Sequence, residues 1–144
     1  MKTMSYLSRV LCALMLCAGL VVTGCKKESL GENERNHDLS ADATANCYIV
    51  SKAGGYSFKT VKGNSSESVG TVDKAEVLWE SFGTDVAPSV GDLVKNVTYK
   101  DGNIAFEATD KKGNAVIAAK DAEGNILWSW HIWLTDQPAE HVYN

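Results

Sequence analysis

Between residues 46 and 136 the chain alternates apolar and polar residues in short runs, and this period of two is the feature that most limits its fold. Successive side chains of a strand point to opposite faces, so such alternation predicts half-buried strands rather than helices. The runs with this pattern span residues 47–51, 56–61, 68–72, 75–81, 94–99, 103–109, 115–120 and 126–134. We therefore expect an all-β fold.

Glycine-containing turns separate these runs. Asp101-Gly102 lies between two alternating runs and favours a type I′ turn, because both central residues of that turn need a positive φ. It predicts a hairpin between residues 96–99 and 104–107. Short strands at such regular spacing are typical of a two-sheet β-sandwich, Ig-like or related, of about seven or eight strands. We place this domain at residues 46–136, followed by a C-terminal tail at residues 137–144.

The N-terminus has the features of a secretory signal. Lys2 and Arg9 precede an uncharged apolar run of 14 residues, which is shorter than the roughly 20 residues that span a bilayer as a helix. The run ends in Val22-Thr23-Gly24-Cys25, which resembles the bacterial lipobox. The resemblance implies that residues 1–24 are a signal-peptide helix removed by cleavage, and that Cys25 carries a lipid that anchors the chain in a membrane. The alternative is an ordinary secretory signal followed by a chance cysteine.

This interpretation changes the meaning of the four cysteines. Cys12 and Cys17 lie in the signal and Cys25 carries the lipid, so Cys47 has no intrachain partner. We expect Cys47 to be a buried apolar side chain at the start of a strand. A reactive thiol is the alternative, although no Lys, Arg or His flanks Cys47 in the sequence.

Residues 25–45 are expected to form a flexible tether, because they contain only Leu30 and Leu39 as large apolar residues. The tether begins Lys26-Lys27-Glu28, which resembles the charged signals that send Bacteroidales lipoproteins to the outer face of the outer membrane. Arg35 is the only arginine after the signal. Because fimbrillin precursors of the same bacteria are trimmed after an arginine, Arg35 is a candidate cleavage site. A solvated tether residue is the alternative.

The charge of the chain excludes one class of partner. The whole chain has a net charge of −4, and loss of the signal leaves 12 basic and 18 acidic residues, a net charge of −6. Nucleic-acid binding needs a basic surface, so we expect no nucleic-acid partner. The sequence contains no P-loop, zinc-binding or nucleophile-elbow motif. We expect no catalysis, no cofactor and no metal.

A tryptophan-rich segment supplies the candidate ligand-binding residues. In a strand, Trp128, Trp130 and Ile132 share one face, which we expect to line the core, while His131 and Trp133 share the other. An exposed Trp133 would stack on a sugar ring, with His131 beside it. Core packing is the alternative for Trp133, and a hydrogen-bonded strand histidine is the alternative for His131.

Three segments carry a resemblance to a known family. They are an N-terminal segment with the runs 46–50, 55–58 and 61–64, the run Gly113-Asn114-Ala115-Val116-Ile117-Ala118, and residues 126–136 with Trp128-Ser129-Trp130-His131-Ile132-Trp133. They resemble the N-terminal β module of Bacteroidales surface lipoproteins, of the fimbrillin-like and Fibrobacter-paralogous type. Longer relatives continue into a C-terminal domain, and this chain ends before it.

The resemblance implies a lipid-anchored module on the outer membrane surface with a structural or adhesive, fimbria-related role. Its partners would be the membrane, through the lipid on Cys25, and other surface or fimbrial proteins or glycans. The alternative is a carbohydrate-binding accessory lipoprotein that uses exposed aromatic side chains.

Overall fold

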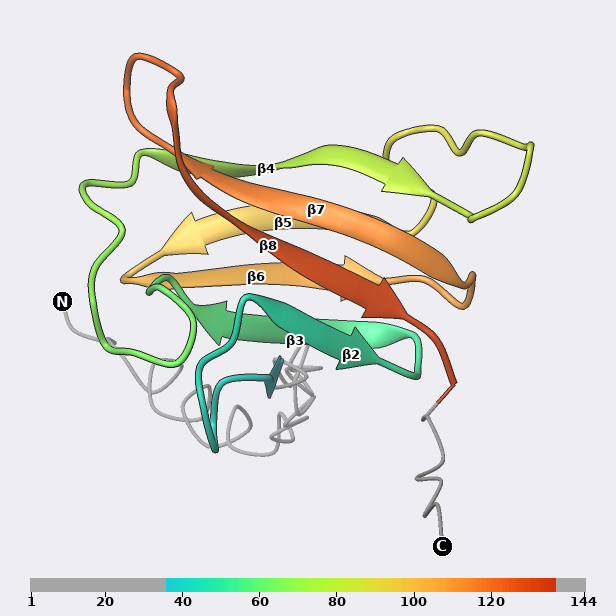
Figure 1. The fold of residues 1–144 in the computed structure, drawn as a ribbon, viewed down its shortest axis with the longest axis horizontal. Helices are drawn as coiled ribbons and strands as arrows, with labels where there is room; N and C mark the ends of the chain where they lie inside the picture. Colours follow the sequence, from blue (N-terminus) through green and yellow to red (C-terminus); the bar gives the residue numbers. More distant parts are fainter. Residues whose placement is uncertain (1–35, 137–144) are drawn as a thin grey trace, which may run out of the picture. The chain divides into compact units, whose positions relative to one another are not determined.

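The structure is a computed structural model that describes residues 36–136 (Figure 1). Cys25, Arg35, the expected signal and the expected tail lie outside the described residues. The described part contains strands and no helix. The strands are β1 His37–Asp38, β2 Cys47–Val50, β3 Gly54–Lys59, β4 Lys74–Ser81, β5 Val94–Lys100, β6 Asn103–Ala108, β7 Gly113–Lys120 and β8 Ile126–Leu134. The all-β prediction is confirmed.

The strands form two four-stranded sheets, with the orders β1-β3-β6-β5 and β2-β8-β7-β4. The pairs β1–β3 and β2–β8 are parallel and the other pairs are antiparallel. In Figure 1 the strands of one sheet cross over those of the other. This is the two-layered sandwich that the alternation predicts. Within residues 36–136, no helix is long and apolar enough to span a membrane.

Most of the expected strands are present, with small differences at their ends. The Asp101-Gly102 hairpin is confirmed, since these residues have φ values of 49° and 79° and β5 pairs with β6. The expected strand at residues 68–72 is wrong. Only one isolated bridge, between Val61 and Ser68, forms there, because this segment finds no continuous partner in either sheet.

Aromatic side chains from both sheets make the centre of the core. Trp130 of β8 and Phe58 of β3 are buried, and their ring centroids lie 5.2 Å apart across the sandwich. The ring of Phe58 also lies 5.3 Å from that of Tyr48 and 6.2 Å from that of Phe106. Each sheet therefore contributes two of the four rings, and their packing holds the layers together.

The ordered fold starts earlier than the expected tether allows. Residues 36–45 lie against the sheets: Leu39 N donates to Ser57 O at 2.8 Å, and Lys59 N donates to the buried Ser40 hydroxyl at 3.0 Å. Asn64 N donates to Thr44 O at 2.9 Å. Backbone and small polar groups hold this segment, and Leu39 and Ala45 pack partly buried against the core. Residues 36–45 therefore belong to the fold, although their composition predicts a flexible tether.

A β-bulge in β4 turns one tryptophan outward. Val77 pairs with Ile117, but the next pair joins Trp79 to Val116, so Leu78 is the extra residue. In a regular strand, Val77 and Trp79 would point to the same face. The bulge shifts the register, so that Trp79 lies on the outer face of the sheet and Glu80 points inward.

The inward-facing Glu80 carboxylate organises the segment that leads into β5. Its two oxygens accept four backbone hydrogen bonds, from the N–H groups of Gly91, Asp92, Leu93 and Val94 at 2.7–3.1 Å. Leu93 and Val94 are fully buried. The carboxylate therefore satisfies backbone donors that the approach to the core would otherwise leave unpaired.

We predict that Trp130→Ala lowers the free energy of unfolding by about 3–5 kcal/mol, because it opens a large cavity between the sheets. Trp130→Phe should cost less, since the Trp130 Nε1–H has no hydrogen-bond partner among the described residues. Urea unfolding followed by circular dichroism measures both. Trp133→Ala is the control, because Trp133 is exposed. Equal losses for Trp130→Ala and Trp133→Ala would contradict the assigned core.

Glu80→Gln should destabilise the fold by about 1.5–3 kcal/mol, because an amide replaces one acceptor oxygen with a donor that faces backbone N–H groups. Hydrogen exchange should show faster opening of the amides of residues 91–94. Glu107→Gln, a change on the solvent-facing side of the sheet β1-β3-β6-β5, should leave the exchange rates of these amides unchanged.

Candidate functional site

The outer face of the sheet β2-β8-β7-β4 carries the candidate site. Paired residues on neighbouring strands point to the same side of a sheet, so the register defines rows across it. One row is Cys47, His131, Val116 and Trp79, and the next is Ile49, Trp133, Asn114 and Ser81. We call these two rows the outer face.

The outer face exposes three large apolar side chains. The exposed fractions are 49% for Trp79, 42% for Ile49 and 40% for Trp133. Single exposed apolar residues are common on protein surfaces, but here three of them share one face of one sheet. The same alternation buries Trp130, as its position in the strand predicts.

Trp128 belongs to the edge of the core rather than to the outer face. It is partly buried against the core, and its Nε1–H donates to Asn46 Oδ1 at 3.0 Å. The Nζ of Lys62 lies 5.7 Å from the centroid of its ring. These contacts occupy Trp128, so Trp79 and Trp133 are the tryptophans available to a ligand.

A chain of three hydrogen-bonded polar side chains runs across the outer face from β2 to β7. Cys47 Sγ lies 3.1 Å from His131 Nδ1, and His131 Nε2 lies 2.8 Å from Asn114 Oδ1. An amide oxygen accepts but does not donate, so Nε2 carries the imidazole proton. In the neutral ring Nδ1 is then an acceptor, and the Cys47 thiol donates to it.

This arrangement corrects the expectation for Cys47. The residue begins β2 as predicted, but it is exposed rather than buried. Its neighbour His131 is 84 residues away in the sequence, so flanking residues gave no sign of it. His131 is hydrogen-bonded on both ring nitrogens, which agrees with its interpretation as a hydrogen-bonded strand histidine. Partial burial raises the pKa of the Cys47 thiol above its ordinary value.

The fold brings these three residues together in two ways. The parallel pairing of β2 with β8 places Cys47 directly opposite His131. Asn114 follows Gly113 at the start of β7, where a Cβ on Gly113 would lie 2.4 Å from Ser81 O. Glycine therefore lets β7 approach β4 closely just before Asn114, which lies diagonally across from His131.

The two histidines that the structure describes, His37 and His131, do not gather into a metal site. His37 lies on β1 in the other sheet, and His141 lies outside the described residues. Among residues 36–136, no group of three or more His, Cys, Asp or Glu side chains is placed to hold a metal ion.

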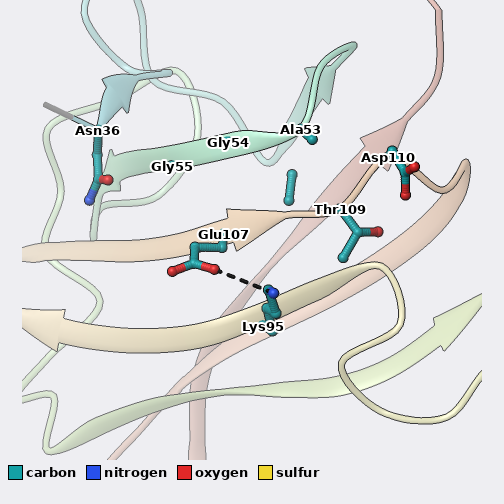
Figure 2. A pocket seen from close by; sticks show the side chains of 9 residues that line it. Asn36, Ala53, Gly54, Gly55, Lys95, Glu107, Thr109 and Asp110 are labelled. Atoms are coloured by element: carbon teal, nitrogen blue, oxygen red, sulfur yellow. Dashed lines mark ion pairs between the residues drawn. The ribbon is translucent and has the colours of Figure 1, made fainter. Parts of the chain in front are cut away.

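A depression lies on the solvent-facing side of the sheet β1-β3-β6-β5 (Figure 2). It forms where Gly54 and Gly55 leave space beside β6, and Asn36 fills part of that space. Lys95 and Glu107 form an ion pair across it, with Nζ and Oε2 3.7 Å apart. This ion pair engages the carboxylate of Glu107, whereas the outer face of the sheet β2-β8-β7-β4 exposes two tryptophans, so that face is the stronger candidate site.

The fold defines the chain as an all-β, two-sheet sandwich. Comparison with models of protein families, with curated proteins and with solved structures gives no match for this chain. The features of this chain that bear on its function are therefore the residues of the outer face and the sequence of the N-terminus.

Proposed function

We propose that this protein is a lipid-anchored, non-catalytic adhesive module of the cell surface, and that its outer face binds carbohydrate. The observation that carries the proposal is the exposure of Trp79 and Trp133 on one face of one sheet. Tryptophan dominates binding surfaces because an indole ring offers a large, flat apolar area at a low cost in side-chain entropy.

The arrangement of the outer face suits a sugar polymer. Trp79 and Trp133 lie two strands and one row apart, which corresponds to roughly 12 Å between their Cα atoms at ordinary strand spacing. Sugar rings present apolar C–H faces that stack on indoles. Asn114 and Ser81 lie between or beside the two indoles, and the Asn114 amide N–H groups and the Ser81 hydroxyl are groups that hydrogen-bond to sugar hydroxyls. The face thus combines two stacking surfaces with a polar centre.

The anchoring part of the proposal rests on the sequence. The apolar run and the Val22-Thr23-Gly24-Cys25 motif favour lipid attachment at Cys25. The charged residues after it favour display on the outer membrane surface, and trimming after Arg35 would release residues 36–136 from the lipid. These assignments place the outer face where it meets extracellular glycans.

A structural role in a surface or fimbrial assembly is the second candidate function. Ile49 lies beside Trp133 on the outer face and is 42% exposed. An aliphatic side chain next to an indole, with no charged residue in either row, is typical of the centre of a protein–protein interface. In this role, the outer face would pack against another protein.

Replacing Cys25 with alanine should abolish incorporation of a radioactive fatty acid, because the thiol that accepts the lipid is lost. Labelling of the full chain in the producing cells, followed by electrophoresis, measures this. Cys47→Ala is the matched control and should label normally. Undiminished labelling of Cys25→Ala would contradict lipid attachment at this residue.

The full chain, purified in mild detergent, should bind a subset of polysaccharides on a glycan array. Trp133→Ala and Trp79→Ala should each weaken that binding about tenfold or more, since each removes a stacking surface. Val90→Ala is the control, because Val90 is 75% exposed and belongs to neither row of the outer face. A uniform signal across the array would contradict carbohydrate binding and leave the structural role as the better proposal.

A further inference from the structure

The hydrogen-bonded chain Cys47–His131–Asn114 has a use that sugar binding does not explain. It joins a thiol to a base and the base to a side chain that fixes its tautomer. This is the general pattern of an activated nucleophile, in which a third group orients the base. We propose that Cys47 is a nucleophilic thiol that exchanges with uncharged, apolar disulfides, with His131 as its base and Asn114 as the residue that positions the base.

The geometry permits deprotonation at the moment of attack. The thiol donates to His131 Nδ1 over 3.1 Å, which lies within the range for a sulfur donor. Because partial burial raises the pKa of Cys47, the thiol keeps its proton at neutral pH until a base removes it. Thiols with a higher pKa give more nucleophilic thiolates, so assistance by a base suits this cysteine.

The reaction balances without a further reagent. The Cys47 sulfur attacks one sulfur of R–S–S–R while His131 Nδ1 takes the thiol proton. A new S–S bond joins Cys47 to one R–S group as the old S–S bond breaks. The leaving thiolate then takes the proton from the imidazolium, which gives R–SH and a mixed disulfide on Cys47.

The open position of Cys47 favours this chemistry over acyl transfer. Attack on a disulfide needs a base and a clear line of approach, whereas acyl transfer also needs donors that stabilise an oxyanion. Cys47 is exposed and begins β2, which lies at the edge of its sheet. The approach to its sulfur is therefore open.

The neighbours of Cys47 define the disulfide class. Ile49 and Trp133 form the adjacent pair on the outer face and are both exposed. Neither row contains Asp, Glu, Lys or Arg. An apolar or aromatic R group would rest on these two side chains, while a charged one would find no partner in the two rows. The thiol site does not depend on carbohydrate binding.

The test measures how fast dithiodipyridine, a neutral aromatic disulfide, forms a mixed disulfide with the full chain in mild detergent. Mass spectrometry of the Cys47 peptide separates this reaction from those of other cysteines. His131→Ala should slow the reaction about tenfold or more, because it removes the base. His37→Ala is the matched control and should react at the wild-type rate. Thermal unfolding shows which variants remain folded.

A pair of substitutions at Asn114 separates positioning from simple packing. Asn114→Asp keeps an acceptor for His131 Nε2–H and should retain the wild-type rate or exceed it. Asn114→Leu removes that acceptor and should react several times more slowly. If these two variants react alike, or if a folded His131→Ala variant reacts at the wild-type rate, the proposed base and its positioning are overturned.

The disulfide class has its own test. Trp133→Ala should slow the reaction with dithiodipyridine but not that with bis(hydroxyethyl) disulfide, which is small and polar. An equal effect on both reagents would overturn the preference for apolar disulfides.

Discussion

The arrangement of this protein depends on the two-residue repeat of β8. This strand lies inside its sheet between β2 and β7, so both of its faces are defined by neighbours. Trp130 and Ile132 fill the core, while His131 and Trp133 point outward. A shift of one residue would exchange the two sets and bury an imidazole in place of an indole. The packing of Trp130 against Phe58 therefore fixes the register of β8, and with it the positions of the outer residues.

The same register sets the contents of the candidate site. Because β2 runs parallel to β8, Cys47 faces His131 and Ile49 faces Trp133. Because β7 runs antiparallel on the other side, Asn114 lies opposite Trp133 and reaches His131 diagonally. The chemistry of the outer face is thus a consequence of strand pairing, and a change in the core would alter it without touching any of its residues.

The sequence predicts the local features of the fold better than the non-local ones. The alternation around Trp130 and the Asp101-Gly102 turn depend on neighbouring residues, and both predictions hold. The expected strand at residues 68–72 fails because a strand needs a partner, which local alternation does not supply. Residues 36–45 are held by hydrogen bonds such as that from Lys59 N to Ser40. The amino-acid composition of the segment does not reveal such bonds.

In the candidate site, too, the sequence predicts the features that depend on neighbouring residues and misses those that depend on strand pairing. Alternation places Trp133 on the outer face, so this part could be predicted. The outward position of Trp79 depends on the bulge at Leu78, for which no turn residue gives a signal. Cys47, His131 and Asn114 meet only through the pairing of three strands, and Cys47 and His131 are 84 positions apart in the sequence. Residues that far apart reveal their contact only when the topology is known.

The shape of the outer face also limits what it can bind. Small ligands bury most of their surface in concave pockets, and a pleated sheet face offers less contact to each of their atoms. An extended ligand gains contacts along its length, and the two exposed tryptophans lie on different strands of the same face. A polymer that crosses the strands would reach both indoles together, and the effective concentration at the second contact would strengthen binding. A flat face with separated aromatic residues is therefore better suited to a polysaccharide than to a monosaccharide.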